Sequence, residues 1–198
     1  MDSRLVADVS GKGVSSALLA SLLQGALIAA TEDPGVMGHR MERLNRFLMD
    51  RTGGEKYATV FYCLLKLDGR LTYVNAAHCP PILVRAGGEL STLEATGMPV
   101  GLMETAEFGV AEERLAPSDK VVIYTDGVTE AQNAAGEFFG KKRLREIVTA
   151  HAAEPCQAIH DAIQAAVTEF TEGAPQSDDI TLVVLEVRGN VSPQGEGE

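Results

Sequence analysis

The apolar segments of this chain occur in blocks, and the order of these blocks is the strongest constraint on the fold. Helical patterns are expected over residues 14–31, 38–51, 141–152 and 156–170. Strand-like runs are expected over residues 5–7, 58–67, 71–75, 82–85, 89–93, 108–115, 121–125 and 180–187. Six of these strands follow one another without an intervening helix. This order favours antiparallel sheets with helices packed outside them, and not a doubly wound parallel sheet.

The chain is long enough to bury one sizeable core. It has 198 residues, of which 45% are hydrophobic, and we expect a single domain over residues 1–188. Residues 189–198 are rich in Gly, Pro and Glu and lack an apolar pattern, so we expect a disordered tail there. The most apolar segment, residues 14–30, contains Ser15, Ser16, Ser21 and Gln24, which makes it too polar for a membrane span and predicts a buried helix.

The formal charge of −11 excludes two classes of partner. A nucleic-acid backbone or an anionic membrane would be repelled at long range, so neither is expected. The three cysteines, Cys63, Cys79 and Cys156, have no spacing typical of zinc or of a disulfide framework. Together with the absence of a signal-peptide pattern, this favours a reducing, cytoplasmic compartment.

The stretch LVADVSGKGVSSALL, residues 5–19, raises the question of a phosphate-binding glycine loop. A Walker A loop would require glycine at Val6 and Ser or Thr at Gly13, so that interpretation fails. A dinucleotide fingerprint would require Gly or Ala at Ser16. The remaining candidate is Asp8, which ends an apolar strand, although an aspartate there is also typical of a helix N-cap.

Two further acidic positions repeat this pattern. Asp126 ends the apolar run at residues 121–125, and Asp178 and Asp179 stand directly before the last strand. A single aspartate at a strand end is usually a turn former. Three such positions predict that carboxylates converge at one edge of the core, where a hard cation such as Mg²⁺ or Mn²⁺ would offset their repulsion.

The chain resembles the SpoIIE-like branch of the metal-dependent (type 2C, PPM) protein serine/threonine phosphatases. The matching stretches, in the family's order, are ADVSGKGVSSALL, NRFL, ATVFYCLL, LTYVNAAHCPPILV, GMPVGL, VVIYTDGVTEA, FFGKKRL and SDDITLVVL. The resemblance implies an α+β fold, an α/β/β/α sandwich of two antiparallel sheets. It also implies that Asp8 bridges two Mn²⁺ or Mg²⁺ ions, that the carbonyl of Val9 binds one of them, and that Asp126 and Asp178 complete the other, with Asp179 beside them.

The activity implied by the resemblance is hydrolysis of phosphoserine or phosphothreonine on a regulatory protein. The implied partner is an anti-sigma-factor antagonist of bacterial partner switching, and a homodimer is a further expectation. Two alternatives stay open: a phosphatase-fold module that binds a partner without turnover, and an aspartyl-phosphate phosphatase. The second would require an aspartate at Val128.

Several positions are ambiguous or depart from the family pattern. His78 is expected to be a hydrogen-bonded structural residue, and Lys12 could contact a phosphate or be solvated. Ala77 replaces a glycine of the family, and Cys79 precedes Pro80, which puts the local turn in question.

Family members also carry a Gly-Gly-Asp segment before the Asp8 motif. We therefore expect this chain to hold the second ion weakly, to be less active than a longer form and to self-associate along the exposed strand edge.

Overall fold

The computed structural model describes residues 2–11, 13–28, 33–176 and 178–187. The tail predicted at residues 189–198, the last residues of the first predicted helix and the side chain of Lys12 lie outside the described residues.

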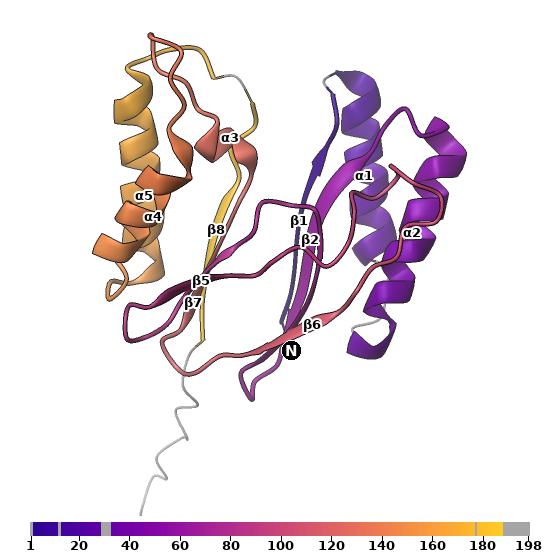
Figure 1. Ribbon diagram of the computed structural model, residues 1–198, viewed down its shortest axis with the longest axis horizontal. Coiled ribbons are helices and arrows are strands. Elements are labelled where there is room, and N and C mark those ends of the chain that lie inside the picture. Colours follow the sequence, from indigo (N-terminus) through magenta and orange to yellow (C-terminus); the bar gives the residue numbers. More distant parts are fainter. Residues whose placement is uncertain (1, 12, 29–32, 177, 188–198) are drawn as a thin grey trace, which may run out of the picture.

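Two four-stranded antiparallel sheets form the centre of the structure (Figure 1). The first sheet has the order β1-β2-β3-β6, and the second has the order β5-β4-β7-β8. The strands are β1 (Asp2–Val9), β2 (Ala58–Leu65), β3 (Arg70–Ala76), β4 (Ile82–Val84), β5 (Leu90–Thr92), β6 (Ala111–Arg114), β7 (Lys120–Tyr124) and β8 (Leu182–Glu186).

Helices cover the outer face of each sheet (Figure 1). The helices α1 (Val14–Ile28) and α2 (Met37–Thr52) lie on the first sheet, and α4 (Gly140–Ala150) and α5 (Cys156–Thr171) lie on the second. Two short elements complete the described structure, the 3-10 turn η1 (Pro34–Val36) and the single-turn helix α3 (Asp126–Thr129). The predicted α/β/β/α sandwich is therefore confirmed.

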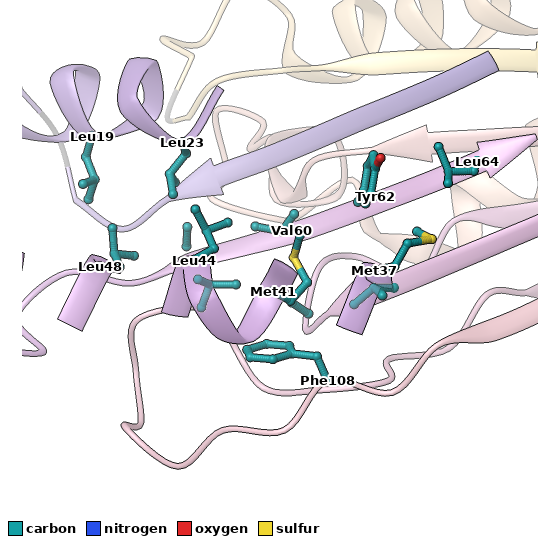
Figure 2. Close-up of a cluster of buried hydrophobic side chains, with 14 residues drawn as sticks. Leu19, Leu23, Met37, Met41, Leu44, Leu48, Val60, Tyr62, Leu64 and Phe108 are labelled. Atoms are coloured by element: carbon teal, nitrogen blue, oxygen red, sulfur yellow. The ribbon is translucent and has the colours of Figure 1, made fainter. Parts of the chain in front are cut away.

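Three apolar layers hold the sandwich together. On β2, Val60 and Tyr62 face α1 and α2, whereas Phe61 and Cys63 face the second sheet, as the two-residue period of a strand requires. Figure 2 shows the first layer, where leucines and methionines of both helices gather over β2. The central layer joins the two sheets, and the third lies between the second sheet and the helices α4 and α5. These layers fix the strand ends that carry the candidate site.

The prediction of a buried first helix is only half right. Leu19 and Leu23 of α1 are buried against the sheet, but Val14, Leu18 and Leu22 are 78%, 62% and 49% exposed. Helix α1 therefore packs on one side only. No helix within the described ranges is long and apolar enough to cross a bilayer.

Three further differences from the predicted elements have local causes. Strand β1 begins at Asp2, because its polar first half pairs in register with β2 although it lacks an apolar pattern. Strand β6 starts only at Ala111, since the backbone around Phe108 pairs instead with Gly97 and Thr96. Helix α3 was not predicted, because one helical turn is too short to produce a periodic pattern.

Candidate functional site

The predicted acidic positions lie at one end of the sandwich, where β1 and β7 finish and β8 begins (Figure 1). Asp8 is the penultimate residue of β1, and Asp126 starts α3 one residue after the end of β7. Asp178 and Asp179 precede β8. Burial raises the pKa of Asp8 above its ordinary value, and the negative charges of Asp126, Asp178 and Asp179 raise it further. The N–H of Val9 acts in the opposite direction. The carboxylates from three strand ends are therefore close enough to repel one another.

The hydroxyl of Thr125 ties two of these segments together. It donates a hydrogen bond to the backbone carbonyl of Asp179 over 2.9 Å and accepts one from the N–H of Thr181 over 2.8 Å. A third bond, from the N–H of Thr125 to the carbonyl of Thr181, continues the β7–β8 ladder by one step. Because Thr125 directly precedes Asp126, these bonds hold Asp126 beside the segment that carries Asp178 and Asp179.

Gly127 allows the close approach of that segment. A Cβ atom at this position would lie 2.4 Å from the carbonyl oxygen of Asp179 and 3.3 Å from that of Asp178. The first distance is far below a van der Waals contact, so a side chain would force the backbone apart. Glycine is therefore needed here for packing and not for an unusual φ angle.

The carboxylate of Asp126 has one oxygen that the surrounding residues leave unpaired. Its Oδ1 atom is buried and has no hydrogen-bond partner among the described residues. Buried polar atoms are almost always paired, and an unpaired carboxylate oxygen among other carboxylates is a costly arrangement. A divalent cation would satisfy this oxygen and offset the mutual repulsion, so the chemistry of these oxygen donors suits a hard metal ion.

The carboxylates nevertheless do not form a closed coordination shell. Within the described ranges, no three His, Cys, Asp or Glu side chains are arranged so that they could hold a metal ion. Asp178 and Asp179 are exposed, whereas Asp8 and Asp126 are half-buried. Val9 is the last residue of β1, next to Asp8, and its role as a carbonyl ligand stays a prediction.

A lysine in the loop between α2 and β2 fixes the loop after Asp8. The Nζ atom of Lys56 donates to the carbonyl of Ser10 and to the hydroxyl of Ser16, each over 3.2 Å. Gly11 has a φ angle of +82°, and a Cβ atom there would lie 2.5 Å from Nζ of Lys56. Gly11 thus turns the chain away from Asp8 and leaves room for the lysine.

His78 lies near this end of the sandwich as a buried residue. Its Nδ1 is 2.9 Å from the hydroxyl of Thr59, and its backbone N–H donates to Oδ1 of Asn75 over 2.8 Å. Burial lowers the pKa of His78, although the charge of Asp126 acts against this shift. Ala77 beside it has a φ angle of +56°, so the turn that glycine would favour forms with alanine.

The sequence predicted that the aspartates converge, but it did not predict the residues that position them. Thr125, Gly127 and Lys56 act through contacts across the fold, and the Lys56 and Thr125 bonds join residues 46 and 54 positions apart. The one signal in the sequence for Thr125 and Gly127 is that they stand directly before and after Asp126.

This fold is shared with solved phosphatase domains of the PP2C type. The structure of the RsbU and RsbW domains of Rv1364c from Mycobacterium tuberculosis superposes with a TM-score of 0.74 at 25% identity, over 94% of this chain and 53% of that one. The catalytic domain of the serine threonine protein phosphatase PstP, in complex with two manganese ions, superposes with a TM-score of 0.66 at 15% identity, over 92% and 86% of the two chains.

The sequence comparison is more specific than the fold. Residues 4–188 match the family described as Stage II sporulation protein E (SpoIIE), and the chain belongs to this family. The phosphoserine phosphatase RsbU of Bacillus subtilis is 26% identical over 182 residues, which cover 91% of this chain and 54% of RsbU. The chain spans about half the length of this relative and of the phosphoserine phosphatase RsbP of the same organism.

Proposed function

We propose that this chain hydrolyses phosphoserine or phosphothreonine on a regulatory protein and that Mn²⁺ or Mg²⁺ supports the reaction. The observation that carries the proposal is the buried, unpaired Oδ1 of Asp126 beside the carboxylate of Asp8. Membership in the SpoIIE family and the similarity to RsbU support the reaction type.

Asp8, the carbonyl of Val9, Asp126 and Asp178 would hold the two ions, with Asp179 beside them. When bound, the ions would lower the pKa of a water molecule and offset negative charge on the phosphoryl oxygens. The chain itself keeps the carboxylates in position. Thr125 and Gly127 hold Asp126 against the Asp178 segment, and Lys56 holds the loop after Asp8.

For the partner, we propose a phosphorylated anti-sigma-factor antagonist in a cytoplasmic partner-switching pathway. This proposal rests on membership in the SpoIIE family and on the similarity to the phosphoserine phosphatases RsbU and RsbP.

A homodimer is proposed along β1, which pairs only with β2 among the described strands. An unpaired strand edge favours association with a second chain, and analytical ultracentrifugation over a range of concentrations tests this.

The activity is tested with p-nitrophenyl phosphate and a phosphoserine protein, with and without Mn²⁺. Asp126→Asn removes a ligand charge while keeping the shape of the side chain, so turnover should fall by more than about 100-fold. Asp161→Asn is the matched control, because Asp161 is exposed on α5 and is not among the carboxylates that act on Asp8. Thermal unfolding of both variants shows whether they fold.

The outcomes separate the proposed enzyme from the alternative binding module. Mn²⁺-dependent turnover that disappears in Asp126→Asn supports the enzyme. A folded wild-type chain that binds the phosphoprotein without hydrolysing it would identify a binding module. Turnover that is equal in wild type and Asp126→Asn would rule out the metal site proposed here.

A further inference from the structure

A pocket of about 230 Å³ lies beside the acidic edge, between the second sheet and the first turns of α4. Ile82, Thr92 and Tyr124 of the sheet form its floor, and Lys141 and Arg145 of α4 form its basic side. The two basic residues are four positions apart on α4, so they lie on the same face of the helix.

The side chains of these two residues differ from those of the other basic residues of α4. Within the described residues, neither the ammonium group of Lys141 nor the guanidinium group of Arg145 forms an ion pair or a hydrogen bond. Lys142 is paired with Glu146 over 3.9 Å, and Arg143 donates to the carbonyl of Phe139 over 2.8 Å. Two unpaired cations on one wall of a pocket are available for an anionic ligand.

The pocket adjoins the candidate site. Tyr124 lines the pocket and is separated from Asp126 only by Thr125. Burial and, to a lesser extent, the charge of Asp126 raise the pKa of the Cys79 thiol to about 11, while the charge of Lys141 acts in the opposite direction. The thiol therefore lies within electrostatic reach of both the acidic edge and the basic side of the pocket.

The charge of the pocket is opposite to that of its surroundings. The whole chain carries −11, and the neighbouring edge is lined by carboxylates. Among the described residues, the lining of the pocket contains two cations and one carboxylate, Glu94, which accepts a hydrogen bond from the hydroxyl of Thr92. An acidic segment of a substrate would thus be repelled by most of the surface and attracted at this point.

We propose that Lys141 and Arg145 form a subsite for an acidic side chain of the substrate phosphoprotein, located near its phosphoserine. The subsite makes these two residues determinants of substrate specificity. The proposal rests on the phosphatase function proposed above, since it places the substrate by its phosphorylated residue. The ligand chemistry is a carboxylate of Asp or Glu, bound through charge-assisted hydrogen bonds.

The test compares two synthetic phosphoserine peptides of equal length, one with Asp and Glu around the phosphoserine and one with Asn and Gln. With Mn²⁺, the wild-type chain should show a kcat/KM about five- to tenfold higher for the acidic peptide, as expected for two exposed ion pairs. In the double variant Lys141→Ala/Arg145→Ala this ratio should fall to about 1. The preference should also weaken as the salt concentration rises.

Two further variants test whether the preference for the acidic peptide depends on the charges of Lys141 and Arg145 in particular. Lys142→Ala removes one positive charge from an exposed side chain of α4 that is paired with Glu146 and does not line the pocket, so it should keep the preference for the acidic peptide. Lys141→Glu/Arg145→Glu should reverse the preference toward a peptide with Lys around the phosphoserine. A wild-type ratio near 1, or an unchanged ratio in the double alanine variant, would overturn the proposal.

A second measurement distinguishes a failure of the proposed phosphatase function from a failure of the proposed subsite. If the wild-type chain hydrolyses neither the peptides nor p-nitrophenyl phosphate, fluorescence anisotropy of the two labelled peptides tests the subsite without turnover. Tighter binding of the acidic peptide that is lost in the double alanine variant would support the subsite. Equal binding of both peptides would overturn it.

Discussion

The hydroxyl of Thr125 donates to the backbone carbonyl of Asp179 over 2.9 Å, across 54 positions of sequence. This bond joins the end of β7 to the segment before β8, and it places Asp126 beside Asp178. The position of the acidic edge therefore depends on a residue without a charge.

Thr125→Val should destabilise the domain and reduce its activity. Valine has the shape of threonine but lacks the hydroxyl, so the carbonyl of Asp179 and the N–H of Thr181 each lose a partner. We expect a loss of about 1–3 kcal/mol in the free energy of unfolding, measured with urea. Thr125→Ser keeps the hydroxyl and should stay closer to wild type. Equal stability of the valine and serine variants would contradict this role.

Gly127→Ala tests the close approach of the Asp178 segment. The added Cβ atom would lie 2.4 Å from the carbonyl of Asp179, so the backbone must move, at a cost of about 1–3 kcal/mol. Because the displaced segment carries Asp178, Mn²⁺-supported turnover should fall as well. Gly87→Ala is the control, since a Cβ atom there has no neighbour within 4 Å. A stable, fully active Gly127→Ala variant would show that the segment is free to shift.

The sequence predicted the acidic edge because each aspartate follows or precedes an apolar run that reads clearly as a strand. Asp8, Asp126 and Asp178 could therefore be placed at strand ends before any topology was known. The supporting contacts could not be predicted in this way. Lys56 reaches Ser10 and Ser16 only because β2 pairs with β1 in one particular register, and that register is a property of the folded sheet.

Parts of the fold could not be predicted either, because they too depend on contacts that exist only in the folded protein. Periodicity gave the number and type of the long elements, but the polar half of β1 is a strand only through its pairing with β2. The exposed side of α1, with Leu18 and Leu22, could not be distinguished from its buried side because both are apolar.

Ala77→Gly should stabilise the protein. Ala77 is exposed and has a φ angle of +56°, where a Cβ atom costs about 1–2 kcal/mol. The greater flexibility of glycine in the unfolded chain offsets part of this gain, which leaves about 0.5–1 kcal/mol. Ala134→Gly, at an exposed loop position with negative φ, should instead lose stability. Equal losses in both variants would show that the turn at Ala77 is unstrained.

The pH dependence of stability should include a contribution from Asp119. Burial by itself would raise the pKa of this carboxyl group, but the N–H groups of Ala116 and Ala86 and the guanidinium of Arg85 hold it below its ordinary value of 3.8. Arg85 donates to Asp119 over 3.0 Å. A lowered pKa in the folded state means that this stabilisation is complete above the ordinary value and is lost as the pH falls through the folded one.

Asp119→Asn measures this contribution. The variant should be about 2 kcal/mol less stable than wild type at pH 7, and the difference should shrink as the pH falls below 3.8. Urea unfolding at a series of pH values gives both quantities. Asp50→Asn, at an exposed position on α2, is the control and should show little difference from wild type at pH 7. A difference for Asp119→Asn that persists undiminished at low pH would contradict the role of its charge.

The most direct test of the metal site is a calorimetric titration of Mn²⁺ into the wild-type chain and into Asp126→Asn, because it reads metal binding without requiring turnover. The buried, unpaired Oδ1 of Asp126 predicts saturable binding by wild type and an affinity at least about tenfold lower in the variant. No saturable binding by the folded wild-type chain, or equal affinity in both proteins, would contradict the assignment of this acidic edge as a metal site.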